Sequence, residues 1–388
     1  MICGAQHPVK KLAVFVIFTT MMCMIYRETA LMTSPASIRR TKRVAILRPF
    51  STERASNLKE SFDTWSEYLP CKPDGSEPTI AMEFDLFLSY SQSYDGNNTS
   101  ALDADKSTQF LIDNFQSFPW SKCFQNVYRI ETNTPADQDL YLPSEMDNPL
   151  WVNGPNQQFV KSMNIIQDFH VPDSHTRQVY DYVFVMESDV LPIKVNWLKN
   201  LMEEAQQKDF CMLGSKYAGE AWNGFRSSLP LALQHHLNGN SVYNLRHPLM
   251  KFLLKQLLKE KDTIYNSVPY DYRIAQILVE GFLGVEPALP AASTNVRHHG
   301  LHDDAEIKYF RRMWNRYGMA DGEAVMIESK VIKNYVGSPL LPRHIKTMEA
   351  SLIHGAMLYS DWKKNNYVSS EIVFIHLKVA FNCNVFLT

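Results

Sequence analysis

Strand-like and helix-like segments alternate between residues 43 and 192, and this order constrains the fold more than any other feature. The apolar segments 43–50, 84–90, 126–131 and 180–192 are typical of strands, and the segments 51–65, 109–115 and 157–169 between them are typical of helices. Alternating strands and helices form βαβ units, in which successive strands are parallel and the crossovers are right-handed. The sequence therefore predicts an α/β fold with a Rossmann-type, mostly parallel sheet flanked by helices.

The expected strand 180–192 carries the strongest functional signal. Its aromatic and β-branched residues predict a buried strand that stops on Glu187 and Asp189. Residues two apart on a strand share one face, and Pro192 is expected to end the strand because it donates no hydrogen bond. Two carboxylates at the carboxyl end of a strand suit Mg²⁺ or Mn²⁺, with a diphosphate as co-ligand. A β-turn in which Asp189 bonds its own backbone is the alternative interpretation.

An apolar run at residues 12–26 follows Lys10 and Lys11. It is shorter than the ~20 residues that usually span a bilayer, and it falls within the range of signal-peptide cores. Because no small-residue cleavage site follows promptly, we favour an uncleaved signal-anchor over a cleaved signal peptide. The lysines before the run then orient the chain as a single-pass type II protein, with its body in the lumen of the endoplasmic reticulum or Golgi.

This interpretation divides the chain into five parts. They are a cytoplasmic tail (1–11), a transmembrane anchor (12–26), a stem (27–42), a main domain (43–362) and an apolar C-terminal tail of uncertain structure (363–388).

Two further features fit a lumenal body. Asn97 and Asn98 are overlapping acceptors for N-linked glycosylation. Cys71 and Cys123 lie in loop-like surroundings, so a disulfide between them fits an oxidising compartment. Cys211 opens an expected strand and is expected to be a buried free thiol.

The composition excludes several classes of protein. With 45% hydrophobic residues and a formal net charge of −2, the chain has the composition of a globular domain and is neither disordered nor attracted to polyanions. The basic cluster at 39–43 has no interleaved aromatic residues, so we expect no nucleic-acid partner.

Over residues 43–362 the chain resembles the GT-A class of nucleotide-sugar-dependent glycosyltransferases. The resemblance rests on the acidic E-x-D motif at the end of an apolar strand, on the order of the later motifs, and on the short tail, anchor and stem. It implies a GT-A-like catalytic domain that transfers a sugar from a nucleotide-diphosphate donor to a glycan or glycoprotein acceptor, with Mn²⁺ or Mg²⁺ as cofactor. The class usually carries D-x-D, so Asp189 corresponds to the direct metal ligand, while Glu187 and Ser188 correspond to metal or donor contacts.

Two later motifs match the acceptor side of that class. Asn238, Gly239 and Asn240 resemble its Gly-containing acceptor loop, and a simple turn is the structural alternative. Asp271 stands at an expected helix start, where inverting members of the class place their general base. An Asp at that position is ordinarily a helix cap, so both roles remain open.

The last matches concern the metal and the diphosphate. His354 ends an apolar segment and matches the late histidine of the class, in preference to the histidine-rich cluster at 297–304. Arg48 lies near the carboxyl end of the first strand and could help to hold the nucleotide, although an arginine there is more often a plain surface residue.

Two rival functions belong to other classes. A catalytically inactive lumenal relative could keep the fold as a binding or scaffold protein, and the Glu187 variation fits that alternative. A secreted phosphoesterase would use the same carboxylates, but that class needs a denser set of Asp and His ligands near its first strand, and residues 44–50 contain none.

Overall fold

The computed structural model describes part of the chain. The described residues are 41–51, 55–71, 82–91, 99–135, 138–139, 152–172, 174–188, 190–207, 209–218, 236–259, 269–283, 326–335, 339–340, 350, 352–354 and 357–358. The chain forms two compact units, 1–41 and 42–388, and apart from Thr41 every described residue belongs to the second. The predicted anchor, the C-terminal tail, Asn97 and Asn98 lie outside the described residues. No helix in the described part is long and apolar enough to cross a membrane.

The second unit contains helices and strands in alternation, as expected. The described helices are α2 (Ala55–Glu67), α3 (Thr99–Asp113), α4 (Asn153–Gln167), α5 (Trp197–Gln207), α8 (Pro248–Lys259) and α10 (Tyr270–Leu283), with 3₁₀ turns η2 (Phe115–Ser117) and η3 (Pro119–Cys123). The described strands are β1 (Lys42–Phe50), β2 (Met82–Tyr90), β3 (Asn126–Glu131), β4 (Phe169–His170), β5 (Arg177–Gln178), β6 (Tyr182–Val185), β7 (Leu191–Pro192), β8 (Met212–Gly214), β9 (Tyr217–Ala218), β10 (Val242–Asn244), β11 (Met326–Glu328), β12 (Ile332–Tyr335), β13 (Pro339–Leu340), β14 (Leu352–His354) and β15 (Met357–Leu358).

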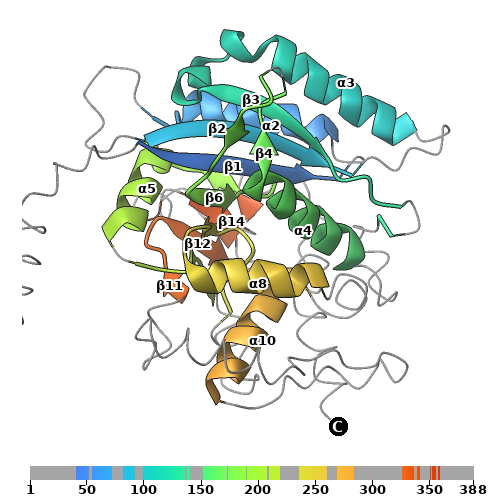
Figure 1. Cartoon of the computed structure of the whole chain (residues 1–388). Coiled ribbons are helices and arrows are strands. Elements are labelled where there is room, and N and C mark those ends of the chain that lie inside the picture. Colours follow the sequence, from blue (N-terminus) through green and yellow to red (C-terminus); the bar gives the residue numbers. More distant parts are fainter. Residues whose placement is uncertain are drawn as a thin grey trace, which may run out of the picture. The chain divides into compact units, whose positions relative to one another are not determined.

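The largest sheet in the described part has seven strands in the order β11-β8-β10-β6-β1-β2-β3. β1 lies parallel to both β2 and β6, and β3 lies parallel to β2. β10 runs antiparallel to its two neighbours, β6 and β8, whereas β11 is parallel to β8. Helices cover both faces of this sheet, with α2 and α3 on one side and α4 and α8 on the other (Figure 1). The predicted fold class, a mostly parallel sheet flanked by helices, is confirmed.

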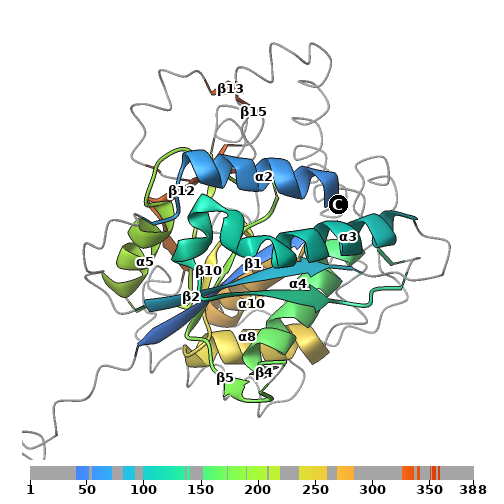
Figure 2. The same cartoon turned by 90° about the horizontal axis from the view of Figure 1, so that it is seen from above.

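The apolar residues of the central strands alternate between two cores. Val44 and Ile46 of β1 pack in the core under α2, α3 and α5, whereas Ala45 and Leu47 pack in the core under α4, α8 and α10. In the view from above, α2 and α3 run side by side within the first of these helix layers (Figure 2). A strand segment whose two faces are both buried has no polar face, so residues 44–47 of β1 form a continuous apolar run.

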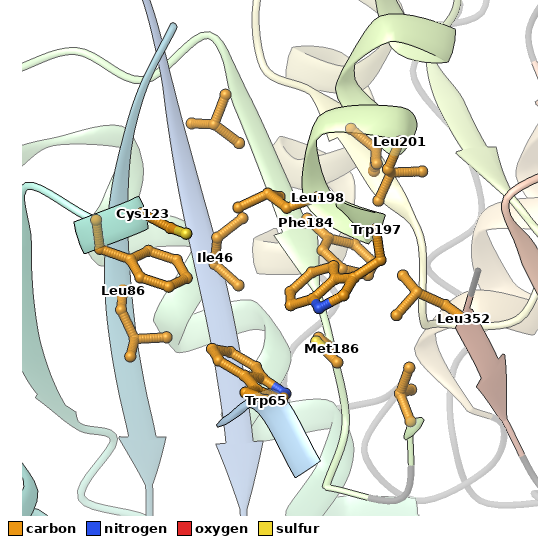
Figure 3. Close-up of a cluster of buried hydrophobic side chains, with 14 of the residues drawn as sticks. Ile46, Trp65, Leu86, Cys123, Phe184, Met186, Trp197, Leu198, Leu201 and Leu352 are labelled. Atoms are coloured by element: carbon orange, nitrogen blue, oxygen red, sulfur yellow. The ribbon is translucent and has the colours of Figure 1, made fainter. Parts of the chain in front are cut away.

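Aromatic rings dominate the first of these cores. The rings of Trp65 and Trp197 lie 5.2 Å apart, and Trp120 packs against Trp65 at 5.4 Å. Figure 3 shows Trp65 and Trp197 beside Ile46 and Met186, which come from β1 and from the residue after β6. Such pairs add about 0.5–1.5 kcal/mol each beyond the burial of their area. The core thereby holds α2 and α5 against the two strands whose ends carry the candidate site.

Several predicted element bounds need correction. α4 begins at Asn153 and not at 157, and its first turns bury polar residues such as Asn156, which an apolar pattern does not reveal. α3 begins at Thr99, well before the expected start at 109. The apolar pattern missed the first half of this helix because polar side chains there are exposed to solvent. α2 begins at Ala55 and not at 51; Ser51 is not helical, and residues 52–54 lie outside the described residues.

The prediction that Pro192 ends the strand 180–192 is also wrong. β6 stops at Val185, and Pro192 belongs to a separate strand, β7, which pairs antiparallel with β14 in a second sheet of order β7-β14-β12-β9. A proline is tolerated in β7 because this strand lies at the edge of its sheet.

The cysteines follow the sequence interpretation. Cys71 and Cys123 form a disulfide, which joins the segment after α2 to η3. Cys211 is a free, fully buried thiol just before β8, and burial raises its pKa well above the usual value.

Candidate functional site

The carboxyl ends of β1 and β6 meet where the strand order of the sheet reverses. The chain runs from β1 outward to β2 and β3, and then returns to place β6 on the other side of β1. Ligands of open α/β sheets bind in the crevice at such a switch point. A pocket of about 190 Å³ lies here, bordered by Leu47 and Ser51 at the end of β1 and by Val185 and Glu187 at the end of β6. Pockets for drug-sized ligands begin at roughly 300 Å³, so this volume suits one ring of a larger ligand.

Aromatic rings from two helices form a further part of the pocket wall. Phe159 of α4 and Tyr270 of α10 stack face to face, with their centroids 3.8 Å apart and an interplanar angle of 8°. Gln158, also in the wall, donates through Nε2 to the carbonyl oxygens of Phe50 at 3.1 Å and Ser89 at 2.6 Å. This amide ties α4 to the ends of β1 and β2 and so fixes the wall to the sheet.

Glu187 is held by Asn240 through both its main chain and its side chain. The Glu187 N–H donates to Asn240 Oδ1 at 2.7 Å, and Asn240 Nδ2 donates to Glu187 Oε2 at 2.9 Å. Glu187 is partly exposed at the pocket, whereas Asn240 is buried. The arrangement fixes one carboxylate, a hard oxygen donor, at the border of the pocket.

The residues after β6 form a turn and not an extended strand end. β6 ends at Val185, and the Val190 N–H donates to the Glu187 carbonyl oxygen at 3.0 Å. The expectation that the strand continues to Glu187 is therefore wrong, and the placement of the two carboxylates on one face stays a prediction. Ser188, a predicted donor contact, is partly exposed and borders the pocket. Asp189 lies outside the described residues.

Arg48 is completely buried. Its Nη1 donates to the carbonyl oxygens of Met186, at 2.9 Å, and Glu187, and its Nη2 donates to Ser61 Oγ. The guanidinium carbon also lies 5.6 Å from the ring centroid of Trp65. The prediction that Arg48 binds the nucleotide is wrong, because its charged group is enclosed by protein. It instead fixes the main chain at the end of β6, and the carbonyl oxygens compensate its buried charge.

The predicted acceptor loop turns its amide groups inward. Asn238 is 5% exposed and Asn240 is 1% exposed. The Asn240 side chain and main-chain N–H both donate to Asn238 Oδ1, at 2.7 Å and 3.0 Å, and Ser241 Oγ donates to the Asn238 carbonyl oxygen at 2.6 Å. The Asn238 side-chain oxygen and the whole Asn240 amide make their hydrogen bonds within the protein, and a contact of this loop with sugar hydroxyls stays a prediction.

Gly239 lets this loop approach α10 closely. A Cβ atom at Gly239 would lie 2.1 Å from the Tyr270 hydroxyl oxygen, so no larger residue fits without moving that ring. The Gly239 carbonyl oxygen accepts a hydrogen bond from the Tyr243 hydroxyl at 3.0 Å, and its N–H donates to Asp271 Oδ2 at 2.9 Å. Gly239 therefore contributes to the site through Tyr270, which borders the pocket, and does not itself border it.

Asp271 lies in the first turn of α10 and is buried. Its Oδ2 accepts the Gly239 N–H and lies 3.0 Å from His236 Nε2, while its Oδ1 accepts the Tyr272 N–H at 2.8 Å. Burial acts to raise the pKa of Asp271, but the His236 imidazole and the two main-chain donors outweigh it and leave the pKa below its usual value. These contacts make Asp271 an anchor for the loop 236–241, and a lowered pKa makes it a weaker base.

Sequence reasoning missed His236. It is 4% exposed, and its ring faces Asp271 from the residue that opens the loop. The only available signal was the pair His235-His236 immediately before the Leu-Asn-Gly-Asn segment. Nothing in that spacing indicates a contact with a helix that begins more than thirty residues later.

The backbone of His354 lies in β14, beside the strand that follows the Glu187 turn. β14 pairs antiparallel with β7, with Leu352 opposite Pro192 and Ile353 opposite Leu191. His354 directly follows Ile353 in β14, and Leu191 opposite Ile353 lies two residues after Asp189. The side chain of His354 and the competing cluster at 297–304 lie outside the described residues.

The described residues at the pocket offer oxygen atoms that could bind a metal ion. Among the described residues, no group of three or more His, Cys, Asp and Glu side chains is placed to hold a metal ion. Glu187 is the carboxylate that borders the pocket, and Ser188 beside it offers a hydroxyl. Oxygen donors of this kind fit Mg²⁺ or Mn²⁺ and would not suit a soft metal.

Several solved structures of glycosyltransferases are similar to this chain. The galactosyltransferase LgtC with donor and acceptor sugar analogues has a TM-score of 0.34 and 10% identity, over 80% of this chain and 86% of that chain. The mannosyltransferase PcManGT from Pyrobaculum calidifontis with GDP-Man and Mn²⁺ has a TM-score of 0.32 and 12% identity, over 95% and 82% of the two chains. Mouse xyloside xylosyltransferase 1 has a TM-score of 0.33 and 11% identity, over 60% and 79%.

No protein-family model matches the sequence, and no curated protein matches it either. The TM-scores and sequence identities of the solved structures are low.

Proposed function

We propose that this chain is a GT-A-like glycosyltransferase, which moves a sugar from a nucleotide-diphosphate donor to a glycan or glycoprotein acceptor. The observation that carries the proposal is the pocket at the β1/β6 switch point, with the Glu187 carboxylate at its border. This is the position at which an open α/β sheet binds nucleotides. The E-x-D motif in the sequence falls at the same strand end.

A divalent cation, Mn²⁺ or Mg²⁺, belongs to this proposal. Glu187 and Asp189 would supply carboxylate oxygens, and His354 would supply an imidazole. The register of β14 against β7 supports His354 in this role, because it brings that backbone next to the turn. When bound, the cation would neutralise the donor diphosphate and act as a Lewis acid on the leaving group.

The residues of the chain would do the rest by binding and orientation. The pocket takes one ring of the donor against the apolar side chains at the end of β1 and the edge of the Phe159–Tyr270 stack. The Ser188 hydroxyl would donate a hydrogen bond to the nucleotide sugar. We leave a general base at Asp271 out of the proposal, because both carboxylate oxygens make contacts within the protein and the pKa of this residue is lowered.

We extend the proposal to a type II protein of the endoplasmic reticulum or Golgi, with its body in the lumen. The apolar run 12–26, the acceptors Asn97 and Asn98, and the Cys71–Cys123 disulfide support this location, since disulfides persist in oxidising compartments. A glycosidase that removes N-linked glycans should shift the gel mobility of the full-length protein. No shift, together with protease sensitivity from the cytosolic side, would contradict the orientation.

The function itself is tested by hydrolysis of nucleotide sugars. The full-length protein would be assayed with UDP- and GDP-sugars in the presence of Mn²⁺, and again after chelation. We expect turnover with one donor, its loss on chelation, and a loss on the order of 10²-fold or more in Asp189→Asn without unfolding. Nucleotide binding without any turnover would favour the inactive lumenal binding protein instead. Neither binding nor turnover would reject both.

A further inference from the structure

The Glu187 peptide is held from two directions by buried side chains. Asn240 Oδ1 accepts its N–H at 2.7 Å, and Arg48 Nη1 donates to its carbonyl oxygen. Arg48 and Asn240 are 0% and 1% exposed, so neither contact is made by a mobile surface side chain. The main chain of the residue that borders the pocket is thereby fixed on both sides.

Asn240 also reaches the carboxylate of the same residue. Its Nδ2 donates to Glu187 Oε2 at 2.9 Å and to Asn238 Oδ1 at 2.7 Å. A primary amide has two N–H donors and one carbonyl acceptor, and all three groups of Asn240 are engaged here. Aspartate would lack the donors, serine could not make all three contacts, and alanine would make none. The position therefore requires an amide of this length.

The loop that carries Asn240 is anchored in turn by α10. Asp271 Oδ2 accepts the Gly239 N–H at 2.9 Å, immediately before Asn240, and it lies 3.0 Å from His236 at the start of the loop. The Val185 N–H donates to the Ser241 carbonyl oxygen at 3.0 Å, which ties the other end of the loop to β6. Contacts thus run without a break from the buried Asp271–His236 pair to Glu187.

We propose that Asn240 is a positioning residue, which holds the Glu187 carboxylate in the orientation that the site requires. In this arrangement the loop 236–241 supports the donor side of the site, and the buried Asp271–His236 pair sets the position of that loop. This inference deepens the proposed function, and the expected effect of Asn240 on binding rests on that function. We call the two hydrogen bonds between Asn240 and Glu187 the clamp, and the clamp can be tested without any ligand.

The ligand-free test measures amide hydrogen exchange at Glu187 in the full-length protein. Asn240→Ala removes the acceptor of the Glu187 N–H, so exchange of this amide should rise about fivefold to tenfold beyond the change in global stability. Asn244→Ala is the matched control: Asn244 is also buried, its Nδ2 donates to the Phe210 carbonyl oxygen and its Oδ1 accepts the Arg246 N–H. Equal exchange at Glu187 in the two variants would overturn the clamp.

The second test measures Mn²⁺ binding in the presence of UDP and of GDP. Loss of a partner that orients a ligand usually lowers metal affinity about 10–100-fold, and we expect this loss in Asn240→Ala but not in Asn244→Ala. In a double-mutant cycle, Asn240→Ala should add little once Glu187 is alanine, because the two side chains act through one contact. Full additivity, or unchanged affinity in Asn240→Ala, would overturn the positioning role.

The two tests separate failure of the inference from failure of the function. The proposed function is rejected if the wild-type protein fails to bind Mn²⁺ in the presence of UDP or of GDP and also turns over no nucleotide sugar. Any role of Asn240 in binding is then rejected with it. The exchange measurement then still decides whether the clamp on Glu187 exists.

Discussion

Two carboxylate sites lie near opposite ends of the parallel strands, and they differ in what surrounds them. Asp85, near the amino end of β2, is 0% exposed and accepts hydrogen bonds from Asn126 at 2.8 Å, Gln178 at 2.7 Å and Tyr180 at 2.9 Å. Glu187, after the carboxyl end of β6, accepts a hydrogen bond from Asn240 and borders a pocket. One carboxylate is enclosed by donors and the other is fixed at an opening.

The difference follows from the geometry of parallel sheets. At the amino ends, neighbouring strands and loops close over Asp85, and every donor comes from the protein itself. At the carboxyl ends the strand order reverses and leaves a crevice, which the protein lines but does not fill. The amino-end site should therefore contribute to stability alone, and the carboxyl-end site to binding.

The largest expected effect is on the amino-end site. Asp85→Ala would leave the buried polar groups of Asn126, Gln178 and Tyr180 without their acceptor, and it should lower the free energy of unfolding by about 3–5 kcal/mol. Urea denaturation measures this loss. The folded fraction should bind Mn²⁺ and nucleotide as the wild-type protein does. If fully folded Asp85→Ala bound Mn²⁺ or nucleotide more weakly than the wild-type protein, Asp85 would contribute to binding as well as to stability, and the contrast between the two sites would fail.

Glu187→Gln tests the other side of the comparison. Its side-chain oxygen can still accept from Asn240 Nδ2, but the charge is lost, so Mn²⁺ affinity should fall by about 10–100-fold. The free energy of unfolding should change by less than about 0.5 kcal/mol, as for surface substitutions. Calorimetric titration and urea denaturation give the two values. A large loss of stability with normal binding would reverse the assignment.

Gly239→Ala probes how the loop 236–241 shapes the pocket. The added Cβ would meet the Tyr270 hydroxyl at 2.1 Å, so the ring must move, at a cost of about 1–3 kcal/mol in stability. Because Tyr270 borders the pocket, nucleotide binding should weaken as well. Removing the hydroxyl with Tyr270→Phe in the same chain should restore part of both losses. No rescue would indicate that the loop itself had shifted.

The smallest expected effect is the pH dependence of Asp271. Its folded-state pKa is lowered, so its contribution to stability is complete above the unfolded pKa of about 4 and is lost as the pH falls through the folded value. Asp271→Asn should cost about 1–2 kcal/mol at pH 7. The gap to the wild-type protein should narrow as the pH is lowered from 5 to 3 in urea denaturation. A constant gap across this range would contradict the anchoring role of the charge.

The sheet and part of the site follow from the sequence because their signals are local. The alternation of Val44 and Ile46 with Ala45 and Leu47 is visible in the chain itself, and so is the run of apolar residues that leads to Glu187. Such periodic patterns predict parallel strands and place the chemistry at their carboxyl ends before any packing is known. The position of Glu187 beside a pocket agrees with that prediction.

Which partner each polar side chain takes was decided only by the tertiary structure. Arg48 looked like a surface cation and is enclosed with the end of β6, while Asn240 looked like a ligand for sugar hydroxyls and its amide holds Glu187. Asp271 looked like a cap or a base and anchors a loop through His236. These partners are distant in sequence, and the choice among them depends on which groups the packed helices and strands bury together. A buried polar group must find its hydrogen bonds there, and no local pattern encodes where that will be.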